Sequence, residues 1–141
     1  WELFQRVTLG TPHIAGYSLD GKAQGTFLIY QALCQHLGLT PSWSPSQSLP
    51  LPAVSRVEIE AKDKTKEVIQ GNLATGIYDL EGDHNRMAEL LKLPPEKRPS
   101  AFDRLRKHYP VRREFHNTKV KLLNGDTALQ QRVQGLGFRV D

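Results

Sequence analysis

The chain has 141 residues, of which 38% are hydrophobic and 24% charged, so its length allows about one domain with a modest core. Its 19 basic and 15 acidic residues leave a net charge of +4, far from the polybasic composition of a histone-like protein. The single cysteine, Cys34, excludes an internal disulfide framework and a thiolate zinc site. The sequence shows neither the ~20 consecutive apolar residues of a membrane span nor a secretory leader. We therefore expect a soluble, cytoplasmic protein.

The chain begins at Trp1, and its single methionine is Met87. We expect from this a piece cut from a longer polypeptide. Residues 1–53 carry little charge and end in a segment rich in proline and serine, residues 39–53, which reads as a linker because proline blocks both helix and strand pairing. The predicted organisation is residues 1–38, the linker 39–53, and a second part, residues 54–141.

The first part predicts a strand from Val7 that breaks into a loop by Gly16, followed by a helix over 19–37. Ser18 is a suitable N-cap for that helix, and Gly38 is suited to end it. The helix carries apolar residues at helical spacing, namely Ala23, Phe27, Tyr30, Cys34 and Leu37. We expect Phe27, Ile29 and Leu33 to lack part of their cover, because no sheet for this helix to pack on is present in the chain.

The second part predicts strands and helices in the order β-α-α-α-β-α-β, an α+β arrangement. The expected strands are 57–62, 114–123 and 138–140, and the expected helices are 64–78, one that Asp83 caps and that stops before Pro94, one that Ser100 caps, and one from Asp126 to Gln134. About 88 residues make a small core. We therefore expect two copies of the chain to pack together.

The loop 10–17 holds the most informative residues of the chain. His13 follows Pro12 on a loop, and an imidazole, with a pKa near ~6.5, exchanges protons near neutral pH. Gly16 has no Cβ, so a flat ligand can approach the backbone there. By spacing alone, an ordinary surface histidine in a turn is the more frequent interpretation.

The residues around His13 change that weighing. Thr11-Pro12-His13-Ile14-Ala15-Gly16-Tyr17 followed by Leu19-Asp20-Gly21-Lys22-Ala23-Gln24-Gly25-Thr26 resembles the catalytic-histidine segment of the NAD-dependent D-2-hydroxyacid dehydrogenases. Tyr17 and the run 21–26 resemble, within that superfamily, the erythronate-4-phosphate dehydrogenase family of vitamin B6 synthesis. Residues 102–115 and Leu136-Gly137-Phe138 are similar to the C-terminal dimerisation domain of that family. The resemblance covers nearly the whole chain and about the last third of the family's length.

The resemblance implies a role for three residues. His13 is the expected proton donor and acceptor on the C2 oxygen of the substrate, Gly16 is expected against the nicotinamide end of NAD, and Tyr17 is expected to contact the phosphorylated 2-hydroxy acid. It also implies a fold: the C-terminal end of a Rossmann-type nucleotide-binding domain over 1–38, and a small α+β dimerisation domain over 54–141. The expected reaction of the intact enzyme is oxidation of 4-phospho-erythronate to the 2-oxo acid with NAD.

Parts of the family's machinery have no counterpart here. An Arg for the substrate carboxylate, a Glu that orients the histidine and a Gly-x-Gly-x-x-Gly loop cannot be placed in the twelve residues before His13. The nearest match, Gly135-Leu136-Gly137, lacks the third glycine and follows a predicted helix. We therefore expect the 141-residue chain alone to be inactive.

Three further interpretations concern charge and partners. The histidines lack metal-ligand spacing, so we assign no metal. A basic cluster, defined as Arg104, Arg106, Lys107, His108, Arg112 and Arg113, favours a solvated face or an intersubunit ion-pair network over nucleic acid, and contact with a phosphorylated ligand stays open. The alternative to a dehydrogenase piece is a homodimerisation module or an ACT-like regulatory module without catalysis.

Overall fold

The computed structural model describes all 141 residues apart from the side chain of Gln47, and it divides the chain into two compact units. Unit 1 consists of residues 1–15 and 75–110, and unit 2 consists of residues 16–74 and 111–141. Within the described residues we find no helix with both the length and the apolar character that crossing a membrane requires. The expected boundaries at residues 38 and 53 stay a prediction.

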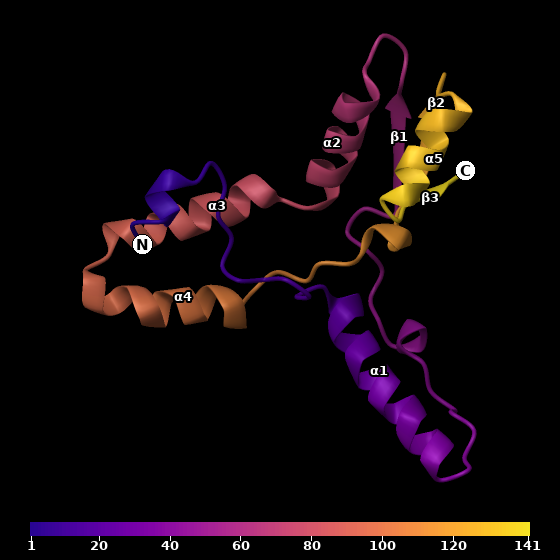
Figure 1. Cartoon of the computed structure of the whole chain (residues 1–141), viewed down its shortest axis with the longest axis horizontal. Helices are drawn as coiled ribbons and strands as arrows, with labels where there is room; N and C mark the ends of the chain where they lie inside the picture. The colour runs from indigo at the N-terminus through magenta and orange to yellow at the C-terminus, as the bar shows by residue number, and fades with distance from the viewer. The chain divides into compact units, whose positions relative to one another are not determined.

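Unit 2 is built on a small parallel sheet, labelled in Figure 1. Strands β1 (Arg56–Glu60), β2 (Lys119–Leu123) and β3 (Arg139–Val140) lie in the order β1-β2-β3. Val57 pairs with Val120 and Ile59 pairs with Leu122, so the apolar residues of β1 and β2 share one face. The alternation of Val57 and Ile59 with charged residues therefore sets which side of the sheet is buried.

Two helices cover the apolar face of this sheet. Helix α2 (Lys66–Ile77) buries Ile69 and Leu73, and helix α5 (Thr127–Gly135) buries Leu129 and Val133. The two helices lie side by side, because Lys66 in α2 pairs with Asp126 at 2.9 Å and Glu67 pairs with Arg132 at 2.6 Å. The other face of the sheet is charged, with Glu58 of β1 3.3 Å from Lys121 of β2.

Helix α1 (Leu19–His36) has well-defined ends. The Ser18 hydroxyl accepts a hydrogen bond from the Gly21 N–H at 3.0 Å. At the other end Gly38, at φ 66°, and Leu39 donate back to the carbonyls of Gln35 and Cys34, which is a Schellman motif. The predicted cap and stop are both confirmed.

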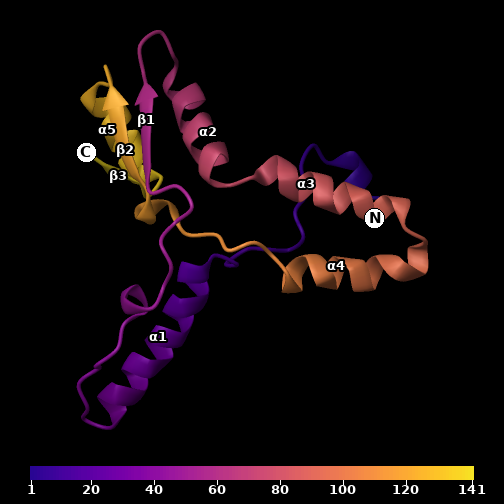
Figure 2. The ribbon, with the colours of Figure 1, turned by 180° about the vertical axis from the view of Figure 1, so that it is seen from behind.

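One side of α1 is covered by the chain that returns along it, as both views show (Figures 1 and 2). Phe27 and Tyr30 pack edge-on against Trp43 at 5.9 and 6.2 Å between ring centres. The opposite side is open, since Ile29 is 73% and Leu33 54% exposed. Ile29 and Leu33 lack cover as expected, whereas Phe27 is half-buried on Trp43.

Unit 1 is a pair of helices that holds the N-terminal segment. Helices α3 (Leu80–Glu89) and α4 (Arg98–Lys107) enclose Met87, Leu90 and Ala101. Phe4 joins this core and stacks on His84 with 5.0 Å between ring centres.

A buried carboxylate closes unit 1. Asp83, with no exposed area, accepts hydrogen bonds from the phenols of Tyr78 and Tyr109 at 2.9 and 2.7 Å and from Arg86 at 2.6 Å. Burial, reinforced by the bond to Asp83, raises the pKa of Tyr109 far above its usual value. Tyr109 therefore stays a neutral donor, and this links the end of α4 to α3.

The α+β fold class and the order β-α-α-α-β-α-β are confirmed, and four element boundaries are corrected. In the described backbone of residues 7–16 no strand forms, since no neighbouring strand pairs with it. Helix α3 begins after Asp79, which caps it through the Gly82 N–H, and Asp83 is instead buried within it. Helix α4 starts at Arg98, before Ser100. Residues 115–117 form a short 3₁₀ turn, and β2 starts only at Lys119.

Candidate functional site

His13 is displayed by two buried neighbours. Pro12 and Ile14 are buried in unit 1, while the side chain of His13 between them is exposed. The His13 N–H donates to the Thr11 carbonyl at 2.9 Å, a three-residue turn, and its φ is 56°. The left-handed region is sparsely populated by non-glycine residues, and such conformations concentrate at functional sites. The backbone thus directs the imidazole outward from between two buried residues.

Gly16 and Tyr17 follow, at the start of unit 2. Gly16 has φ 69°, a conformation that favours glycine, and no atom lies within 4 Å of where its Cβ would be. The backbone at Gly16 is therefore open on the side where a side chain would stand. His13 belongs to unit 1, whereas Gly16 and Tyr17 belong to unit 2.

Lys22 lies on the ring of Tyr17. Its Nζ is 4.0 Å from the ring centre, within the range of a cation–π contact. The two residues flank the Ser18 cap, with Tyr17 just before α1 and Lys22 in its first turn. Sequence reasoning singled out Tyr17 but not its cation.

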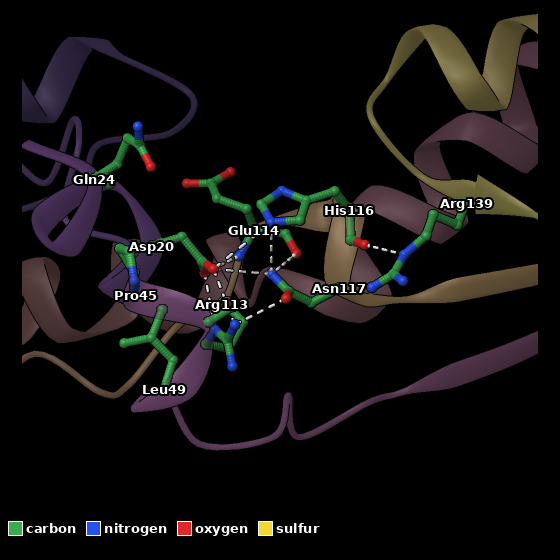
Figure 3. A pocket seen from close by; sticks show the side chains of 11 residues that line it. Asp20, Gln24, Pro45, Leu49, Arg113, Glu114, His116, Asn117 and Arg139 are labelled. Carbon is green, nitrogen blue, oxygen red and sulfur yellow. Dashed lines mark hydrogen bonds and ion pairs between the residues drawn. The ribbon is translucent and has the colours of Figure 1, made fainter. Parts of the chain in front are cut away.

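The first turn of α1 is clamped by the segment 112–117, which precedes β2. The carboxylate of Asp20 accepts two hydrogen bonds from Arg113, at 2.9 and 3.0 Å, in a bidentate pair. It also accepts the Glu114 N–H at 2.8 Å and Asn117 Nδ2 at 3.1 Å. The Leu19 N–H in turn donates to the Arg112 carbonyl at 2.8 Å. We call this set of contacts the α1 clamp; Figure 3 shows its side chains converging on Asp20.

The α1 clamp keeps Asp20 ionised. Burial alone raises the pKa of a carboxyl, but hydrogen bonds from Arg113, the Glu114 N–H and Asn117 outweigh it, so the pKa of Asp20 falls from 3.8 to about 2. Arg113 has further acceptors, because it donates to the Pro50 carbonyl and to Asn117 Oδ1. A hollow of about 770 Å³ adjoins the clamp and is rimmed by Gln24, Leu49 and Arg139 (Figure 3).

Members of the basic cluster differ in their surroundings within the chain. Arg113, 10% exposed, is engaged within the chain by Asp20, while Arg104 and Lys107 lie exposed on α4. The α1 clamp was missed from the sequence because Asp20 and Arg113 stand 93 residues apart and no local pattern links them. Among the described residues, no three His, Cys, Asp or Glu side chains lie close enough to hold a metal ion.

The predicted glycine match at the end of α5 has a structural role. The N–H groups of Gly137 and Phe138 donate back to the carbonyls of Gln134 and Val133, and Gly137 has φ 99°. Gly135-Leu136-Gly137 thus ends α5 in a Schellman motif, and it does not open a helix as a phosphate-binding loop does.

Most of the chain matches a known protein family. Residues 49–137 match the family described as a domain of unknown function, DUF3410. The chain belongs to the DUF3410 family. The DUF3410 match begins within the expected linker, and it includes all of β1, α2 and α5.

The chain is also similar over nearly its whole length to curated proteins named erythronate-4-phosphate dehydrogenase. It is 45% identical over 139 residues to the one from Marinobacter nauticus, covering 99% of this chain and 36% of that protein. The proteins from Pseudomonas putida and Cellvibrio japonicus are each 40% identical, over 136 and 141 residues, with 96% and 98% of this chain and 36% and 37% of those proteins covered. The chain thus spans about a third of the length of these relatives.

Proposed function

We propose that the chain is the C-terminal part of an NAD-dependent erythronate-4-phosphate dehydrogenase. The observation that carries the proposal is the 45% identity over 139 residues to a protein of that name. The exposed imidazole of His13 supports it, because an accessible imidazole can reach a substrate and exchange a proton with it. The open face of α1 supports it too, since a group of exposed apolar side chains such as Ile29 and Leu33 is typical of a surface that another part of a larger protein covers.

In the proposed reaction, His13 holds or moves the proton of the substrate's C2 hydroxyl. The C2 carbon loses a hydride and the C2 oxygen loses a proton, so the hydroxyl becomes the carbonyl of a 2-oxo acid. NAD supplies the acceptor of the hydride, and Gly16 would lie against its nicotinamide end, where the backbone leaves room. The proton passes to the imidazole of His13, whose buried neighbours Pro12 and Ile14 hold the turn in place. Tyr17 would contact the phosphorylated substrate.

The nucleotide-binding part of the proposed enzyme lies mostly outside this chain. Residues 1–38 would be its C-terminal end, with α1 packing on a Rossmann-type sheet. This accounts for the exposed Ile29 and Leu33. The 141-residue chain alone is proposed to be inactive, and the whole enzyme to act in the cytoplasm, in vitamin B6 synthesis.

We also propose that residues 54–141 form a homodimer. Parallel sheets are usually covered on both faces, whereas here the face that carries Glu58, Lys121 and Leu123 is open. A module without catalysis, for dimerisation or ACT-like regulation, remains the second candidate.

The test of the dehydrogenase proposal is NADH formation by the full-length protein with 4-phospho-erythronate. We expect turnover in the parent and a loss of about 10²- to 10⁴-fold in His13→Gln, the usual contribution of a general acid–base. His36→Gln, at the exposed end of α1, is the matched control and should keep full activity. No turnover by the parent would overturn the proposal and leave the dimerisation module.

A further inference from the structure

We propose that Lys22 binds the phosphate group of the substrate and so selects phosphorylated 2-hydroxy acids. The inference rests on the proposed function and deepens it. It starts from the contact between Lys22 and Tyr17, whose ammonium and ring centre are 4.0 Å apart.

The ammonium of Lys22 has no carboxylate partner within 4.0 Å in the described part of the chain, although acidic residues are near in sequence. Asp20, two positions away, is fully engaged: its two oxygens receive Arg113, Asn117 and the Glu114 N–H. Lys22 is therefore an exposed cation, and the acid two positions before it in the sequence is bound by other donors. A dianionic phosphate is the type of ligand that such an ammonium attracts.

Tyr17 limits where that cation can be. An ammonium on a flexible four-carbon stem loses rotamer freedom when it binds, and resting on an aromatic ring reduces the positions it explores beforehand. The first turn of α1 is itself held by the Ser18 cap and by the α1 clamp. The cation thus stands on the residue expected to contact the substrate, in a segment fixed by two independent sets of hydrogen bonds.

The α1 clamp joins this site to the DUF3410 region. Arg113 and Asn117 belong to the matched residues 49–137, while Tyr17 and Lys22 precede them. The region that follows the linker therefore supports the phosphate end of the proposed substrate site, in addition to any role in dimerisation.

The experiment compares two substrates in the full-length enzyme, 4-phospho-erythronate and erythronate, which share the carboxylate and differ in the phosphate. For Lys22→Met we expect the KM for 4-phospho-erythronate to rise by about 10- to 100-fold, the loss of one charge-assisted hydrogen bond, with kcat within about twofold. The kcat/KM for erythronate should stay unchanged. Lys22→Arg should restore most of the affinity, and inorganic phosphate should inhibit Lys22→Met more weakly than the parent.

Lys62→Met, at an exposed lysine beyond β1 in the same unit, is the matched control and should behave as the parent does. Equal losses for both substrates would overturn the inference, because they would indicate a structural role for Lys22 at the start of α1. A Lys22→Met enzyme identical to the parent with both substrates would overturn it as well. In both cases the activity of the parent would leave the dehydrogenase proposal intact, whereas an inactive parent would overturn both.

Discussion

Asp20 is the residue on which the start of α1 depends. Its carboxylate lies at the second position of the helix, where negative charge is favoured, and it receives four hydrogen bonds from the segment 112–117. Because these donors bind the ionised form, the pKa of Asp20 is about 2 in the folded chain. These hydrogen bonds to Asp20 therefore stabilise the fold most at pH values where the carboxylate is ionised in both the folded and the unfolded chain.

Asp20→Asn is expected to lower the free energy of unfolding by about 2 kcal/mol at pH 7, from the pKa difference between folded and unfolded chain. A lowered folded pKa means that this stabilisation is present above about pH 4 and is lost as the pH falls toward 2. Urea unfolding at pH 7, 4 and 3 should show the difference between parent and variant narrowing.

Asp63→Asn serves as the control for this series. Asp63 is exposed and has φ 59°, a conformation that asparagine adopts equally well. It should shift the unfolding free energy by less than about 0.5 kcal/mol. A loss in Asp20→Asn that does not change with pH would contradict the assigned role of the ionised carboxylate.

At the scale of elements, alanine substitutions at the two glycines of α1, Gly21 and Gly25, distinguish the effect of the N-terminal cap from that of helix propensity. A Cβ on Gly21 would lie 2.9 Å from Ser18 Oγ and 3.3 Å from the Gly16 carbonyl oxygen, whereas one on Gly25 would meet nothing within 4 Å. Gly21→Ala should therefore lower the unfolding free energy by about 1 kcal/mol through the damaged cap. Gly25→Ala should raise it by up to about 1 kcal/mol through helix propensity.

Thermal and urea unfolding of the two variants, followed by circular dichroism, test this directly. Opposite shifts are the expected result. Stabilisation by both alanines would mean that the turn of Gly16 and Ser18 is not tightly packed against the first turn of α1.

The sequence predicts correctly those helix ends and strands that are determined by residues adjacent in the chain. The Ser18 and Asp126 caps, the Gly38 stop and the alternation of Val57 and Ile59 in β1 each follow from a few adjacent residues. The errors come from distant contacts. Asp83 has the character of a cap, but it is buried and binds the phenol of Tyr109, 26 positions further along the chain, and Asp79 caps the helix instead. The strand expected at Val7 has no partner to pair with.

The candidate site divides in the same way. His13, Gly16 and Tyr17 stand in one short run, so a resemblance is sufficient to single them out, and the positive φ of His13 and Gly16 agrees with their special positions. Their functional roles stay predictions. The α1 clamp joins residues more than 90 positions apart and emerges only once the chain is folded.

At the scale of the whole molecule, the proposed homodimer predicts a definite mass in solution. The exposed apolar side of α1 is a second possible source of self-association, and a variant separates the two. Sedimentation should show a dimer at micromolar concentration for the chain. It should show the same dimer for the double variant Ile29→Gln and Leu33→Gln, whose changes lie on exposed α1 positions outside residues 54–141.

A strict monomer up to millimolar concentration would contradict the proposed dimer. A monomer in the double variant alone would show that the open face of α1, rather than residues 54–141, joins the copies.

His13 is proposed to serve the chemical step of a dehydrogenase, and binding measured beside turnover tests this role most directly. In full-length enzyme carrying His13→Gln, we predict that 4-phospho-erythronate binds within about threefold of the parent's affinity. We predict that single-turnover NADH formation falls by about 10²-fold or more, since only the proton exchange is lost. Weakened binding with an unchanged single-turnover rate would contradict the claim and would make His13 a residue of the binding surface.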